Sequence, residues 1–124
     1  MDNRVIKFRV WCLKSKKFIE EPTRYERLAI GCNGGVYSGK YDDIVDGYLV
    51  QQYTGLKDKN GVEIYEGDIL KHDIGLGPLY WEVIWDQEAG AWKTTKEHGG
   101  NTGSWFDCYE VAGNVYETPE LIDL

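Results

Sequence analysis

Short stretches in which apolar and polar residues alternate are the dominant pattern along this chain, and they predict β-strands. The first lies at residues 5–12, where every second residue falls on the same side of a strand. One side is wholly apolar and consists of Ile6, Phe8, Val10 and Cys12. The other side is mixed and consists of Val5, Lys7, Arg9 and Trp11. We therefore expect a half-buried strand whose apolar side packs against the rest of the protein.

Turn-forming residues separate the predicted strands. Lys14-Ser15-Lys16-Lys17 forms a polar turn after the first strand. Asn33-Gly34-Gly35 and Asn60-Gly61 each lie between two short apolar stretches. An Asn-Gly step readily adopts the positive φ angles of a tight hairpin turn. The sequence thus predicts two hairpins here, with Asn60 and Gly61 supplying the left-handed positions of the second.

The second half of the chain holds the clearest strand signals. Alternation is strongest at residues 79–85. After Tyr65 we count five predicted strands, at residues 69–72, 79–85, 91–95, 105–111 and 114–116. The last two are separated at Ala112-Gly113-Asn114. Five short strands suit a small, partly open barrel. Thr118-Pro119-Glu120 has the order of an N-cap, a proline and an acidic first turn, and it predicts a short C-terminal helical turn.

These elements indicate a mainly β fold class, α+β at most, in two parts. We expect an N-terminal β meander over residues 1–53, packed on a C-terminal barrel over residues 54–124. The sequence contains no helix-period segment longer than about ten residues.

The composition fits a folded protein of one domain's size. The chain has 124 residues, of which 42% are hydrophobic and 14% aromatic, and this excludes a disordered chain. No apolar run approaches the roughly 20 residues that a membrane-spanning helix needs, and the N-terminus has no apolar signal segment. We therefore expect a cytoplasmic protein without membrane contact.

Charge is distributed unevenly along the chain. The net charge is −7, which disfavours broad binding to nucleic acid. Residues 1–17, however, contain one acid and six bases, namely Arg4, Lys7, Arg9, Lys14, Lys16 and Lys17. This basic hairpin either contacts an anionic partner, or lies against acidic segments of its own chain or of a second copy. A head-to-tail homo-oligomer is one form of the second interpretation.

Cysteine and histidine give little support for metal or thiol chemistry. Cys12, Cys32 and Cys108 are odd in number and widely spaced, so small, partly buried side chains are favoured over disulfides, with a reactive thiol as the alternative. His72-Asp73 and the set His98, Asp107 and Cys108 lack the short paired spacings of zinc sites. We expect no metal and no cofactor.

Carboxylates and aromatic residues have structural explanations of the same kind. Asp58-Lys59-Asn60-Gly61 resembles part of a calcium loop but lacks the required acids, so it indicates a turn. Asp86 and Glu88 could be a glycosidase pair, but acids also cap hairpins. The candidate base-stacking residues, for which core packing or a protein-binding surface are the alternatives, are Tyr80, Trp81, Trp85, Trp92, Trp105 and Tyr109. We expect no catalytic residue and no enzyme.

Three blocks of the chain resemble the YopX protein family, whose members are small proteins of phages and prophages. Residues 6–11 read IKFRVW, residues 52–70 read QYTGLKDKNGVEIYEGDIL, and residues 113–121 read GNVYETPEL. The blocks occur in the family's order and bracket nearly the whole chain.

The resemblance implies a two-part β-rich fold with an SH3-like C-terminal barrel and no established enzymatic activity. Within the matched blocks we expect structural turns at Gly55, Asp58, Asn60, Gly61, Gly67, Asp68, Gly113 and Asn114. Together with the charge pattern, it favours a non-catalytic phage accessory protein that contacts itself and an unknown phage or host protein. The alternative is a nucleic-acid-associated module that binds through the basic hairpin.

Overall fold

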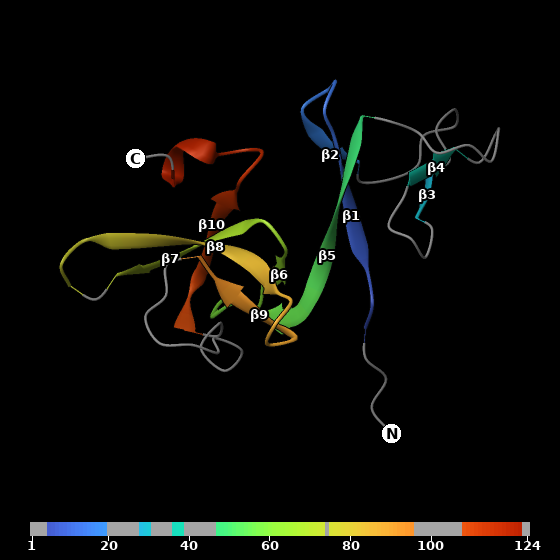
Figure 1. Cartoon of the computed structure of the whole chain (residues 1–124). Helices are drawn as coiled ribbons and strands as arrows, with labels where there is room; N and C mark the ends of the chain where they lie inside the picture. The colour runs from blue at the N-terminus through green and yellow to red at the C-terminus, as the bar shows by residue number, and fades with distance from the viewer. Residues whose placement is uncertain are drawn as a thin grey trace. The chain divides into compact units, whose positions relative to one another are not determined.

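The protein, seen in a computed structural model, is mostly β-strand over its described residues (Figure 1). The structure describes residues 5–19, 28–30, 36–38, 47–73, 75–95 and 108–122. The prediction of a mainly β fold is confirmed. The chain divides into two compact units, which we call the hairpin unit (Phe8–Gln51) and the main unit (Met1–Lys7 and Gln52–Leu124).

The hairpin unit contains two antiparallel strand pairs. β1 (Phe8–Cys12) pairs with β2 (Lys17–Ile19), and β3 (Leu28–Ile30) pairs with β4 (Val36–Ser38). β1 also has the first residues of β5 (Tyr48–Lys57) as its neighbour. The Asn33-Gly34-Gly35 turn lies outside the described residues, but the strands predicted on either side of it are paired.

The main unit contains the rest of β5 and most of the long strands. β6 (Glu63–Tyr65) pairs with β5. A curled antiparallel sheet has the order β10-β7-β8-β9. Its strands are β7 (Asp68–Asp73), β8 (Pro78–Asp86), β9 (Ala91–Thr94) and β10 (Glu110–Asn114). A short 3₁₀ helix, η2 (Pro119–Leu121), follows β10.

The core of the main unit follows from the period-two alternation of these strands. Ile64, Leu70 and Val83 are fully buried. Burying an aliphatic side chain of this size stabilises the fold by about 1.5–3 kcal/mol. Leu56, Trp92, Tyr109 and Val111 pack around the three. The core therefore draws on β5, β6 and all four strands of the curled sheet.

The prediction about which side of the first strand is buried is wrong. Trp11, on the mixed side, is 4% exposed, whereas Phe8 is 42% and Ile6 65% exposed. The basic residues of the mixed side account for this. The Lys7 ammonium lies 5.0 Å from the centre of the Tyr53 ring, and the Arg9 guanidinium lies 4.3 Å from the Phe18 ring. Their long aliphatic stems cover apolar surface while the charges face aromatic rings.

The end of the chain also differs from the prediction. β10 continues through Ala112 to Asn114, with a register shift between Val111 and Gly113, where a break was expected. A β-bulge absorbs the extra residue without ending the strand. Residues 115–117 form a turn and not the predicted strand. The predicted helical turn is confirmed as η2, with Pro119 at its start.

Within the described residues, no helix has the length and apolar character needed to cross a membrane.

Candidate functional site

Asp58 is a buried hydrogen-bond acceptor that joins the β5–β6 turn to β10. Its side chain accepts hydrogen bonds from the backbone N–H groups of Asn60 and Val62, both at 2.8 Å. Its second oxygen accepts one from the N–H of Val111 at 2.9 Å. Buried N–H groups need such partners, because an unpaired one costs about 1–3 kcal/mol. Asp58 therefore has a structural role in which both carboxylate oxygens accept hydrogen bonds from backbone N–H groups.

Asp68 and Asn114 form a second buried polar pair, 1% and 2% exposed. The Asn114 side chain donates to Asp68 at 3.2 Å and accepts from the N–H of Tyr116 at 3.0 Å. Asp68 also accepts from the N–H of Tyr65 at 2.8 Å. The pair thus connects β7 to the end of β10 and to the turn after β6.

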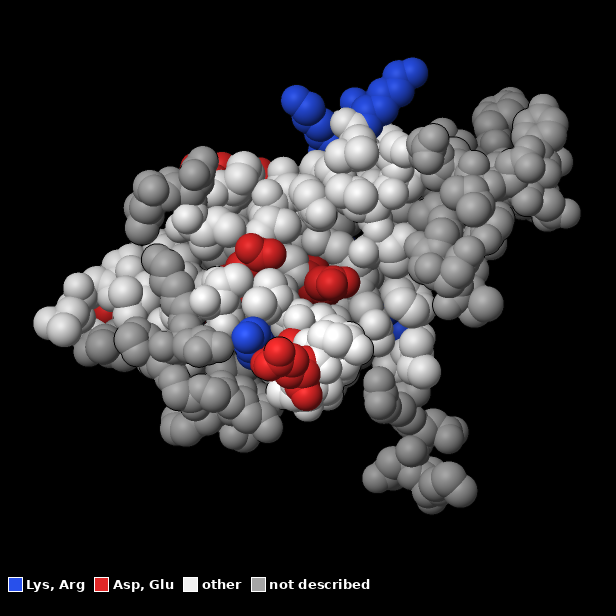
Figure 2. Space-filling model, viewed as in Figure 1, with Lys and Arg blue, Asp and Glu red and all other residues white. Residues whose placement is uncertain are grey.

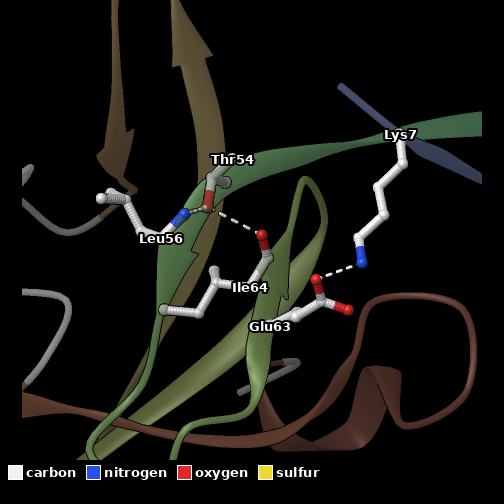
Figure 3. Close-up of polar contacts among 5 residues, drawn as sticks. All are labelled: Lys7, Thr54, Leu56, Glu63 and Ile64. Carbon is white, nitrogen blue, oxygen red and sulfur yellow. Dashed lines mark hydrogen bonds and ion pairs between the residues drawn. The ribbon is translucent and has the colours of Figure 1, made fainter. Parts of the chain in front are cut away.

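Gly55 lies inside β5, where the strand's pairing with β6 shifts register. Its φ of +85° is in the region that favours glycine. The hydroxyl of Thr54 donates to the carbonyl of Ile64 at 2.7 Å and accepts from the N–H of Leu56 at 3.1 Å (Figure 3). The Thr54 hydroxyl is therefore the partner of two backbone groups that the bulge would otherwise leave unpaired.

The remaining predicted turn residues have roles in backbone conformation and packing. Gly61 and Gly67 have positive φ, +80° and +82°. Asn60 does not, so Gly61 alone supplies the left-handed position of the β5–β6 turn. Gly113 has no room for a side chain, because a Cβ would lie 2.0 Å from the Thr118 hydroxyl oxygen.

The six basic residues of the N-terminal segment divide into groups. Lys7 forms an ion pair with Glu63 (Figure 3), and this hydrogen bond raises the pKa of Lys7. Arg9 donates from Nε to the Gln51 side chain at 2.9 Å. Both therefore have partners within the chain. Arg4 lies outside the described residues.

Lys14, Lys16 and Lys17 form the exposed tip of the β1–β2 hairpin. In Figure 2, basic side chains project from this tip into solvent. None of the three forms an ion pair with another described residue of the hairpin unit. Lys16 has a φ of +55° and is the one described residue other than glycine with a positive φ. We call Leu13, Lys14, Lys16 and Lys17 the hairpin tip.

Among the described residues, the candidate metal and thiol residues His72, Asp73, Cys12 and Cys108 form no metal-binding cluster. His72 packs against the aromatic rings of Tyr109 and Trp81, with centroids at 5.1 and 6.4 Å. Across the described ranges there is no group of three or more potential metal ligands. Cys12 is half-buried, whereas Cys108 is exposed. Cys32, His98 and Asp107 lie outside the described residues.

Asp86 caps the β8–β9 turn. Its carboxylate accepts hydrogen bonds from the N–H groups of Ala89 and Glu88, at 3.2 and 3.0 Å, and lies 3.4 Å from the Lys93 ammonium. The Ala89 hydrogen bond, together with Lys93, holds the pKa of Asp86 below its usual range. Asp86 therefore has the structural role that was the alternative to a glycosidase pair.

The aromatic residues divide between core and surface. Trp81 is buried beside Tyr109, with ring centroids 5.3 Å apart. Trp85 is 43% exposed and makes an edge-to-face contact with Trp92. Tyr80 is half-buried on β8. Trp105 lies outside the described residues.

Two carboxylates on the main unit, Glu66 and Glu82, were not singled out by the sequence. The N–H of Gly67 donates to the carbonyl of Val83 at 2.9 Å, so residue 66 lies beside β8. Burial and then the charge of Glu66 raise the pKa of Glu82. We call these two side chains the carboxylate pair. Figure 2 shows acidic groups on the face of the main unit around β8 and β9.

Comparisons with known proteins agree with this fold. The crystal structure of protein EF1440 from Enterococcus faecalis is similar to this chain, with 26% sequence identity and a TM-score of 0.64, over 98% of this chain and 100% of that one. YopX from Bacillus subtilis has 20% identity and a TM-score of 0.49, over 92% of this chain and 95% of that one. No functionally curated protein matches. The sequence profile of the YopX protein family matches residues 7–123, so the resemblance is confirmed and the chain belongs to the YopX protein family.

Proposed function

We propose that this chain is a non-catalytic accessory protein of a phage or prophage that acts in the cytoplasm of a bacterial host through protein–protein contacts, including contacts between its own copies. The observation that carries the proposal is the hairpin tip. It presents three exposed lysines without an ion-pair partner among the described residues of the hairpin unit, on a chain whose net charge is −7. An acidic protein surface is a natural partner for such a tip.

The buried polar residues support the non-catalytic part of the proposal. The carboxylates of Asp58 and Asp68 accept hydrogen bonds from backbone or amide N–H groups of the main unit. Groups used in this way hold turns and strands in register. Their chemistry is accounted for by the fold.

Affinity capture of the tagged protein from host cells carrying the induced prophage tests the proposal. Captures run with and without nuclease separate protein partners from nucleic acid. Retention of the same partner proteins after nuclease is the expected result. Loss of every partner after nuclease would contradict it.

The same tip also favours one alternative, binding of nucleic acid. Clustered lysines neutralise phosphates and give binding that weakens steeply with salt. The net charge of −7 opposes this at long range. A salt titration against single-stranded and duplex oligonucleotides distinguishes the alternatives, since the protein-contact proposal predicts no binding at about 50 mM salt.

A further inference from the structure

We propose that the hairpin unit is an insertion into a main unit that folds without it, so that the hairpin unit unfolds and refolds locally while the main unit stays folded. This inference goes beyond the proposed function, because it concerns how the chain moves and not what it binds. The main unit is discontinuous in sequence, since residues 8–51 separate its first segment, Met1–Lys7, from the rest.

The two ends of the insertion meet within the main unit. Lys7 is the last residue before the insertion, and Gln52 is the first residue after it. The N–H of Tyr53 donates to the carbonyl of Lys7 at 2.8 Å, and the N–H of Glu66 donates to the carbonyl of Gln52 at 2.9 Å. The main unit is therefore continuous in space where it is interrupted in sequence. Adjacent ends of this kind are what allows one domain to be inserted into another.

Side chains hold the same junction together. The Lys7 ammonium forms an ion pair with Glu63 (Figure 3) and lies 5.0 Å from the centre of the Tyr53 ring. Tyr53 is buried, and its ring centroid lies 5.4 Å from that of Tyr65. All four residues belong to the main unit. A cation over a buried ring fixes the short first segment through packing as well as charge, so its position does not require the residues that follow Lys7.

The main unit also has an interior of its own. The core residues Ile64, Leu70 and Val83 all belong to it, as do the described side chains that pack around them. The buried pair Asp68 and Asn114 is hydrogen-bonded within the same unit. Both the apolar core and this polar pair are therefore built without a residue from 8–51.

The hairpin unit has a separate and smaller set of contacts. Trp11 is 4% exposed and packs edge-to-face on Phe18, with ring centroids 4.8 Å apart. The Arg9 guanidinium lies 4.3 Å from the Phe18 ring, and its Nε donates to the Gln51 side chain at 2.9 Å. These four residues all belong to the hairpin unit. The unit thus orders around Trp11 through contacts of its own.

Size and burial indicate which unit unfolds more easily. The hairpin unit, Phe8–Gln51, is close to the roughly 40 residues below which a domain usually needs a disulfide or a metal to fold alone. Among the described residues, the main unit buries several aliphatic side chains completely, whereas the buried hydrophobic residue of the hairpin unit is Trp11. Parts of a protein with less burial open at a lower free energy than the core does. We therefore expect the hairpin unit to open first.

Hydrogen exchange of the full chain, followed residue by residue by NMR, tests the inference. The N–H of Leu13 reports on the hairpin unit, where it donates to the carbonyl of Gly47 at 2.9 Å. The N–H of Gly67 reports on the main unit, where it donates to the carbonyl of Val83 at 2.9 Å. In the wild type, Leu13 exchanges faster than Gly67.

Trp11→Ala removes the centre of the hairpin unit. It raises the exchange rate of Leu13 at least about tenfold, because the lost packing lowers the free energy of local opening. Gly67 keeps its wild-type rate within about twofold, because the main unit does not depend on this side chain. The milder Trp11→Phe raises the Leu13 rate less and also leaves Gly67 unchanged.

Val83→Ala is the reciprocal variant, and Lys14→Ala is the control. Val83→Ala leaves a cavity in the main core and raises the exchange rate of Gly67 at least about tenfold. Leu13 is unaffected, because it exchanges through the easier opening of its own unit. Lys14 is exposed on the hairpin unit, and Lys14→Ala changes neither rate.

The outcomes are distinct from those that test the proposed function, since none of them depends on a partner or on self-association. If Leu13 of Trp11→Ala exchanges as in an unfolded chain while Gly67 keeps its protection, the main unit folds without the hairpin unit, as we propose. If Trp11→Ala accelerates Leu13 and Gly67 equally, or removes protection from the whole chain, the two units fold as one and the inference is wrong.

Discussion

Gly113 and Thr118 approach so closely that a Cβ on Gly113 would lie 2.0 Å from the Thr118 hydroxyl oxygen. That hydroxyl cannot turn away freely. It accepts a hydrogen bond from the N–H of Asn114 at 3.0 Å and donates one to the Asn114 carbonyl at 3.2 Å. The absence of a side chain at Gly113 therefore allows the end of β10 and the start of η2 to pack together.

We predict that Gly113→Ala destabilises the protein by about 1–3 kcal/mol, because the added methyl overpacks this site. The midpoint of urea unfolding measures the change. Thr118→Ala removes the hydroxyl, so Gly113→Ala should cost less in a Thr118→Ala background than in the wild type. Equal costs in the two backgrounds would contradict the close contact.

Asp58→Ala should lower the free energy of unfolding by about 3 kcal/mol, since it leaves three backbone N–H groups without their acceptor. Asp73→Ala is the control, because Asp73 is exposed and accepts one such bond, from Gly75. Its cost should stay below about 1 kcal/mol. Chemical denaturation of both variants makes the comparison, and similar losses would show that burial of Asp58 is not what matters.

Lys16→Gly should stabilise the fold by about 1 kcal/mol, because glycine adopts the φ of +55° without strain. The same variant should associate more weakly at low salt, since it removes one charge from the hairpin tip. Thermal unfolding and light scattering on one sample report the two effects. A variant that is no more stable than the wild type would show that the left-handed conformation costs nothing at this position.

Glu82→Gln should raise stability at neutral pH, and the gain should vanish in acid. Burial and the charge of Glu66 raise the pKa of Glu82 in the folded state, so ionised Glu82 opposes folding above that raised pKa. Well below 4.5, the ordinary glutamate value, the carboxyl is protonated in both states and the difference disappears. Unfolding midpoints across this pH range, with exposed Glu88→Gln as control, provide the check. A gain that persists unchanged in acid would exclude ionisation as its cause.

Sequence patterns predicted the strands well because alternation and turn residues are local signals. The apolar side of β1 was misjudged for a physical reason. Period-two alternation tells which residues share a face, but not which face is covered. Lys7 and Arg9 lie on the covered face because Tyr53 and Phe18 offer ring surfaces for their charges, and those partners are distant in sequence or on another strand.

The candidate site was only partly visible in the sequence. Local charge grouped all six bases of the first 17 residues together. Glu63 and Gln51, which are far along the chain, pair with Lys7 and Arg9 and separate them from the hairpin tip. No sequence motif links Glu66 with Glu82. Residue 66 lies beside β8 because the N–H of Gly67 donates a hydrogen bond to the carbonyl of Val83. A tertiary contact of this kind has no local sequence signal.

Sedimentation of the wild-type protein at tens of micromolar, in low salt and then in high salt, tests the central claim most directly. The account predicts species heavier than the 14.2 kDa chain at low salt, and their return to monomer as salt shortens the Debye length from roughly 10 Å to about 3 Å. A strict monomer under both conditions would contradict it.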